Sequence, residues 1–92
     1  MEAVLDYKRI VEGNNPEDPA ALKISAASTE AIKAGLEQLP PHQKEVLELR
    51  AAGSSYREIA EAMELSDDGL AMSRLYYAQR ALAAILSAEG IS

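Results

Sequence analysis

The stretch from Ser55 to Leu86 constrains the fold of this 92-residue chain more than any other. Ser55 and Glu58 have the spacing of a capping box, in which each side chain accepts a hydrogen bond from a free backbone N–H at a helix start. Apolar residues then recur at helical spacing until the largely polar run of residues 64–69. A second apolar series follows, made of Ala71, Leu75, Ala78, Leu82 and Ile85. Two helices joined by so short a turn predict a helix-turn-helix.

The residues before this stretch predict further helices. Ser28 or Thr29 can cap one helix, which the pair Pro40-Pro41 ends. Pro41 is suited to the first position of the next helix, and Gly53 to its left-handed end. The positions predicted to be buried on these two helices are Ile32, Leu36, Leu39, Val46 and Leu47.

The first 27 residues have weaker patterns. A stripe of Ala3, Val4, Tyr7, Ile10 and Val11 predicts a short N-terminal helix. Residues 13–19 contain two prolines, a glycine and two asparagines, which predict a linker or long turn, and residues 20–27 show a weak helical tendency. Residues 81–86 are apolar nearly all round and need a cover, for which we expect the side chains at positions 4, 7 and 11, with a partner or second copy as the alternative.

The charge balance bears on the partners that the chain can bind. Nine Lys and Arg against fifteen Asp and Glu give a net charge of −6, whereas nucleic-acid binders are usually basic. From Gly69 to Ser87, however, the only charged residues are Arg74 and Arg80. Contact with DNA therefore depends on this locally cationic helix.

The sequence offers no catalytic constellation. It has no cysteine, and its one histidine, His42, cannot form a metal cluster and is expected to be a solvated surface residue. No Gly-rich phosphate loop or serine–histidine motif is present, so we expect no enzyme, no cofactor and no metal. No apolar run approaches the roughly twenty residues that span a bilayer, and we expect a cytoplasmic protein.

From Thr29 to Leu86 the chain resembles the fourth conserved region of bacterial RNA polymerase sigma factors, most closely the extracytoplasmic-function group. The matching positions are Leu39-Pro40-Pro41, Gln43, Glu45-Val46-Leu47, Leu49-Arg50, Gly53, Ser55-Tyr56, Glu58-Ile59-Ala60, Leu65-Ser66, Ser73-Arg74-Leu75, Ala78 and Leu82. The resemblance implies an all-α, four-helix, region-four-like helix-turn-helix domain over residues 28–92, after an N-terminal helix and linker at residues 1–27. It also implies that the last helix reads the −35 promoter element in the major groove and that the domain docks on RNA polymerase. The family's second conserved region has no room in this chain, so we expect a fragment or a stand-alone regulator.

The chain departs from the family where the reading helix begins. Members of the family usually carry Gly-Thr-Val-Lys-Ser-Arg-Leu there, followed by alternating basic residues. Aligning residues 73–75 with the Ser-Arg-Leu of that pattern puts Met72 at the lysine, and Tyr77 and Gln79 at two basic positions. The turn before this helix is one residue longer than in the family pattern and carries Asp67 and Asp68. Their negative charges stabilise the N-terminal end of the helix but repel phosphate.

Seven residues are the candidate DNA contacts. Arg74 can reach a base or phosphate in the groove, Arg80 can contact the backbone, and Arg57 can hold phosphate from the first helix of the motif. The full set is Arg57, Met72, Ser73, Arg74, Tyr76, Tyr77 and Arg80. Lys44 and Arg50 are possible outer contacts, with acidic neighbours at 45 and 48 that can neutralise them. If every basic residue from Lys44 to Arg80 touched phosphate, the salt slope would be about −4.5.

The same residues allow other roles. Arg80 can pair with an acidic neighbour, and Arg57 with Glu61 one helical turn away. Either tyrosine can cover the edge of the core instead. Aromatic and methionine side chains are also enriched at protein interfaces. The alternative function is therefore a sigma-like protein-interaction module that binds RNA polymerase, a sigma regulator or a second copy. The residues on which this alternative depends are Met72, Tyr76, Tyr77 and Gln79.

Overall fold

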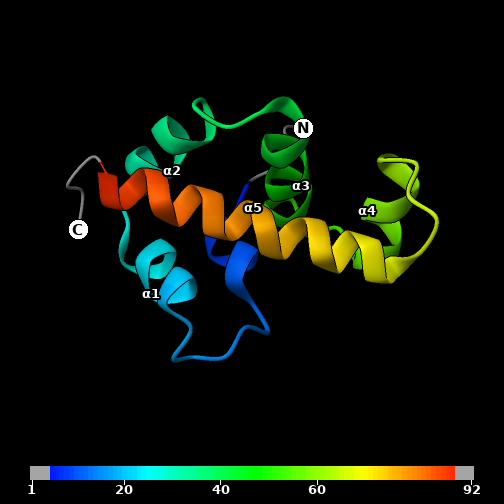
Figure 1. Cartoon of the computed structure of the whole chain (residues 1–92), viewed down its shortest axis with the longest axis horizontal. Helices are drawn as coiled ribbons and strands as arrows, with labels where there is room; N and C mark the ends of the chain where they lie inside the picture. The colour runs from blue at the N-terminus through cyan, green and yellow to red at the C-terminus, as the bar shows by residue number, and fades with distance from the viewer. Residues whose placement is uncertain (1–4, 89–92) are drawn as a thin grey trace.

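The computed structural model describes residues 5–88, which form five α-helices and one 3₁₀ helix, with no strand in that range. In chain order these elements are η1 (Tyr7–Val11), α1 (Pro19–Ala26), α2 (Thr29–Leu36), α3 (Pro41–Ala51), α4 (Tyr56–Ala62) and α5 (Asp68–Ala88). The long helix α5 lies across the others, with α4 beside its N-terminal end and α1 and α2 beside its C-terminal end (Figure 1). The predicted all-α fold class is confirmed. None of the described helices is long and apolar enough to cross a membrane.

Local sequence sets the helix starts as predicted. Ser28 caps α2 by accepting a hydrogen bond from the Ala31 N–H at 3.1 Å, and Pro41 is the first residue of α3. The capping box of α4 is complete, because the Glu58 N–H donates to the Ser55 hydroxyl at 3.1 Å and the Ser55 N–H donates to the Glu58 carboxylate at 2.8 Å. The hydrogen bond from the Ser55 backbone lowers the pKa of Glu58.

The N-terminal segment differs from its prediction at two points. The predicted helix is a short 3₁₀ turn, and its first two predicted members, Ala3 and Val4, lie outside the described residues. Residues 19–26 form a regular α-helix rather than a weak tendency. Asp18 caps it by accepting from the Ala20 N–H at 3.0 Å, and Pro19 is its first residue. The linker therefore ends one residue earlier than predicted, because an Asp-Pro pair is a favourable helix start.

The predicted buried face of α5 is confirmed, with one shift. Ala71, Leu75, Ala78 and Leu82 are each at most 3% exposed, but the face continues to Leu86 rather than to the half-buried Ile85. The predicted cover for residues 81–86 is wrong in its main part, because α1 and α2 lie against this end of α5 whereas η1 packs mainly on α3. Gly35 of α2 approaches so closely that an added Cβ would stand 2.7 Å from Cδ1 of Leu82.

Candidate nucleic-acid interface

The turn between α4 and α5 is fixed by backbone hydrogen bonds. The Leu65 N–H donates to the Ala60 carbonyl at 2.8 Å and the Glu64 N–H to the Glu61 carbonyl at 3.3 Å, which is the pattern of a Schellman motif. Glu64 holds the left-handed position with φ 57°, where glycine is usual. This compact turn presents α5 at a fixed angle to α4. The predicted helix-turn-helix is therefore present.

The start of α5 is capped by a side chain from the turn. Asp67 accepts a hydrogen bond from the Leu70 N–H at 2.9 Å, and Asp68 is an acidic residue in the first turn of the helix. Both positions suit negative charge, because the N-terminal end of a helix carries partial positive charge. The two aspartates therefore have the structural role predicted for them, at the same end of α5 that carries the candidate DNA contacts.

The outer face of α5 is open. Met72 is 52% exposed, Tyr76 44% and Tyr77 66%, and Ser73 and Arg74 are exposed beside them. The opposite face of the same helix is buried in the core, so these side chains project from a rigid support. The structure therefore places the predicted contact residues of α5 on one accessible surface.

One row of this surface lies along the N-terminal loop. Met72, Tyr76 and Arg80 are spaced four residues apart, and Met72 and Tyr76 line a groove of about 300 Å³ whose opposite wall includes Asn14 and Asn15. The Arg80 guanidinium lies 4.3 Å from the centre of the Tyr76 ring, a cation–π distance. The loop of residues 12–18 thus borders the candidate interface.

A second row lies beside the start of α3. Arg74 and Tyr77 line a smaller cleft of about 170 Å³ together with His42, Gln43 and Val46. Tyr77 also packs edge-on against Tyr76, with ring centres 5.8 Å apart. His42 is exposed, as the sequence predicts, and the structure adds that it lines this cleft together with Arg74.

Arg57 and Lys44, two further basic residues considered as DNA contacts, form ion pairs. Arg57 lies 3.7 Å from Glu61 in an ion pair whose side chains are 81% and 73% exposed, and such a pair contributes little stability. Lys44 donates a hydrogen bond to Glu37 at 2.8 Å, which raises the pKa of Lys44, so its ion-pair partner differs from the neighbours predicted.

Arg50, in α3, is held by residues at the start of the helix-turn-helix. It donates to the Ser54 carbonyl at 2.9 Å and lies 4.7 Å from the centre of the Tyr56 ring, and its Nε is buried without a hydrogen-bond partner among the described residues. A guanidinium with these contacts connects α3 to the start of α4. Arg50 is therefore less available to an external phosphate than Arg57.

Gln79 does not belong to any outer surface. It is 2% exposed, accepts a hydrogen bond from the Asn14 amide at 2.9 Å and donates to the Ile10 carbonyl at 2.6 Å. Its predicted place in a protein-binding surface is therefore wrong. The N-terminal segment packs over this position, where a side chain that both donates and accepts hydrogen bonds is needed.

The structural role of residues 12–18 is what sequence reasoning missed. These residues look like a linker because of their prolines, glycine and asparagines. In the structure Asp18 lies 3.6 Å from Arg80, and Asn14 bonds to Gln79. The only local signal was the Asp18-Pro19 pair at the helix start, which says nothing about the distant helix that the loop contacts.

The fold and this surface define a class. Five α-helices with a tight turn before a long, outward-facing helix form a helix-turn-helix domain, a class whose members place such a helix in the major groove of DNA. Residues 29–69 match the family described as Sigma-70, region 4. The chain therefore contains a sigma factor region-four-like domain, a non-enzymatic type of transcription-factor domain whose members bind promoter DNA and RNA polymerase.

The extent of the match is informative. It covers α2, α3, α4 and the turn, and it ends at Gly69, just inside α5. The predicted contact residues of α5 therefore lie beyond the matched segment. No curated protein and no solved structure matched the chain.

Proposed function

We propose that the protein binds promoter-like duplex DNA through α4 and α5 and acts in transcription regulation in the cytoplasm. The carrying observation is the open face of α5, on which Met72, Ser73, Arg74, Tyr76 and Tyr77 project from a helix whose other face is buried. A helix supported in this way enters the major groove without rearrangement. Residues 28–92 form the DNA-binding domain in this proposal, and the described part of the preceding segment, residues 5–27, packs on it.

Each predicted contact has a role in this proposal. Arg74 forms none of the ion pairs found within residues 5–88, so its guanidinium is available for a base edge or a phosphate. Tyr76 and Tyr77 supply hydroxyl donors to phosphate, and Met72 contacts a thymine methyl group. Arg57, at the start of α4, contacts the backbone after breaking its weak surface pair.

The ion pairs reduce the salt dependence that the sequence alone predicts. Lys44 and Arg80 are paired with carboxylates, and Arg50 is held by Ser54 and Tyr56. Arg57 and Arg74 are then the two strongest phosphate contacts, and two contacts give a salt slope of about −1.8 rather than about −4.5. The proposal thus includes weak binding by this domain alone, with RNA polymerase or a sigma regulator adding further contacts.

Fluorescence anisotropy with a labelled −35-type duplex tests the proposal. We expect submicromolar binding at low salt that is lost at moderate salt and abolished by Arg74→Glu. Lys33→Glu is the matched control, because it makes the same charge change at an exposed position on α2. Equal loss in both variants would show that only net charge matters, and no binding by the unaltered protein at low salt would refute the proposal.

The second candidate is a protein-interaction module. The observation that favours it is the cluster of exposed large apolar side chains on α5, formed by Leu70, Met72, Tyr76 and Tyr77, in a protein of net charge −6. A partner of this kind would be RNA polymerase, a sigma regulator or a second copy. Absence of DNA binding together with a dimer in sedimentation, or a stable complex with a purified polymerase subunit, would favour this function.

A further inference from the structure

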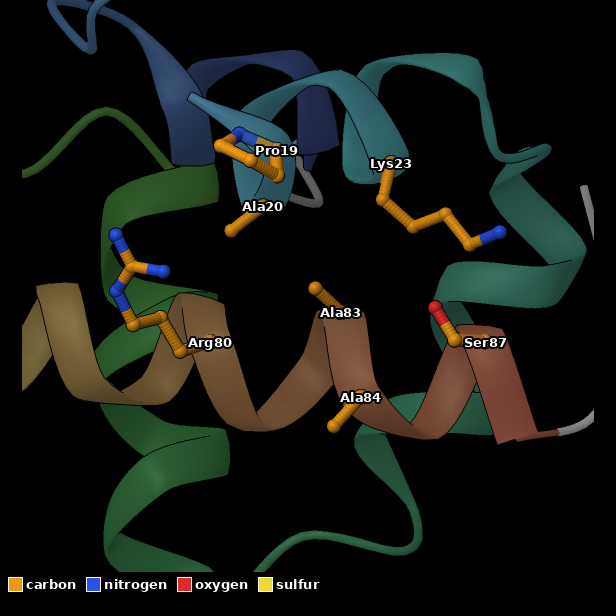
Figure 2. A pocket seen from close by; sticks show the side chains of 7 residues that line it. All are labelled: Pro19, Ala20, Lys23, Arg80, Ala83, Ala84 and Ser87. Atoms are coloured by element: carbon orange, nitrogen blue, oxygen red, sulfur yellow. The ribbon is translucent and has the colours of Figure 1, made fainter.

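Arg80 differs from the other candidate DNA contacts in its ion-pair partner. Its Nη2 lies 3.6 Å from Oδ1 of Asp18, a residue far away in the sequence, and its side chain is 45% exposed. Figure 2 shows the side chain extending beside Pro19, at the start of α1. Among the ion pairs found within residues 5–88, two contain one of the seven candidate DNA contacts. Arg57 pairs within its own helix, whereas Arg80 pairs with a carboxylate from outside its helix. Its charge is therefore already shared with an internal anion.

The carboxylate that holds Arg80 is itself fixed in place. The Asp18 side chain is only 11% exposed, accepts from the Ala20 N–H at 3.0 Å as the cap of α1, and accepts from the Asn14 amide at 3.3 Å. Asn14 is in turn bonded to the buried Gln79. Because Asp18 is already ordered by these bonds, pairing with Arg80 costs it little further side-chain entropy.

The surroundings of Arg80 add further negative charge. Glu17 and Asp18 line a groove of about 360 Å³ together with Tyr76 and Arg80, so two carboxylates stand where a phosphate would approach the guanidinium. On the other side, a second groove runs between α1 and α5 from Arg80 to Lys23 and Ser87 (Figure 2). The acidic groove is the one that borders the tyrosine of the candidate interface.

We propose that residues 12–18 act as a built-in competitor of DNA, in which Asp18 occupies Arg80 and lowers the affinity of the interface for the phosphate backbone. This inference rests on the proposed DNA binding and identifies a control on it. The loop lies outside the segment that matches the sigma family, so the match does not include this control. Displacement of the loop frees Arg80 and strengthens binding.

The test is Asp18→Asn in the full chain. Asparagine is as good an N-terminal cap as aspartate, so α1 keeps its start while the charge on Arg80 is released. We expect the salt slope to steepen by about 0.9, which at 0.1 M salt corresponds to up to about eightfold tighter binding to the same duplex. In the Asp18→Asn/Arg80→Gln double variant the gain should disappear, because the freed cation is no longer present.

The control is Glu17→Gln, which removes the same charge from the adjacent residue, whose carboxylate forms none of the ion pairs found within residues 5–88. We expect Glu17→Gln to give less than half of the increase in DNA affinity that Asp18→Asn gives. Unchanged binding by Asp18→Asn, in a protein that binds DNA and loses binding with Arg74→Glu, would overturn this inference and leave the proposed function intact. Absence of DNA binding by the unaltered protein and by every variant at low salt would overturn both.

Discussion

Replacement of Gln79 by methionine tests whether the N-terminal segment is fastened to α5 by a polar network. Gln79 is 2% exposed, accepts from Asn14 at 2.9 Å and donates to the Ile10 carbonyl at 2.6 Å. Methionine has nearly the same volume, so the change removes hydrogen bonds without a large cavity. Gln79 also donates to the Asn14 side-chain oxygen at 3.4 Å. The two shorter of its three bonds contribute about 1 kcal/mol each, and the buried Ile10 carbonyl left without this donor costs about 1–3 kcal/mol.

Removal of the amide also removes its own desolvation cost, so we expect a net destabilisation of about 2 kcal/mol. In a domain of this size that lowers the melting temperature by about 10 °C. Urea unfolding followed by far-ultraviolet circular dichroism measures the free energy of unfolding directly. A double-mutant cycle with Asn14→Ala should give a coupling energy of about 0.5 kcal/mol or more, because the two amides share one network.

A Gln79→Met protein within about 0.5 kcal/mol of the unaltered protein would refute this reasoning, since that is the effect expected of an ordinary surface substitution. Gln79→Lys extends the test to function. It introduces the basic residue that the family pattern has at this position, yet we expect lower stability and no gain in DNA affinity, because the ammonium would be buried away from the interface.

Four further stability changes follow from single contacts. Ser55→Ala should lower the free energy of unfolding by about 0.5–2 kcal/mol. Folding lowers the pKa of Glu58, so its carboxylate stabilises the folded protein at pH values above its ordinary pKa of 4.5. This stabilisation is lost as the pH falls through the pKa of the folded state. The free energies of unfolding of the unaltered and Ser55→Ala proteins should therefore approach each other in acid. Gly53→Ala should cost about 1–2 kcal/mol at φ 98°, whereas Glu64→Gly, at φ 57°, should stabilise by up to about 1 kcal/mol. Leu82→Ala, at a fully buried position, should cost about 2–5 kcal/mol. Chemical denaturation at matched pH checks all four, and a Glu64→Gly protein less stable than the original would contradict the assigned turn geometry.

The contacts of Gln79 show how the N-terminal segment is fastened to α5. The segment that matches the family ends at Gly69, so Gln79 lies beyond it. In this chain that position is covered by the N-terminal residues, and a neutral side chain with both donor and acceptor atoms satisfies the Ile10 carbonyl and the Asn14 amide. Gln79 is thus matched to the segment that packs over it.

The sequence by itself determined the features that depend on neighbouring residues. The caps of α2 and α4, Pro41 at the start of α3, the left-handed Gly53 and the buried stripe of α5 follow from short spacings. Hydrogen bonds at helix ends and turns join residues a few positions apart, so the local chemistry is sufficient to place them. The exposure of the predicted contacts on α5 follows in the same way, because they lie on the face opposite its apolar stripe.

Only the tertiary structure decided which residues from distant parts of the chain meet. The residues next to Gln79 in the sequence do not show that it is buried, and those next to Asp18 do not show that it pairs with Arg80. The sequence around Leu82 likewise does not show that α1 and α2, rather than the N-terminal stripe, cover its end of α5. Each of these contacts joins residues that are tens of positions apart. Their formation depends on which packing buries the most apolar surface while satisfying every polar group, and that is a property of the whole fold.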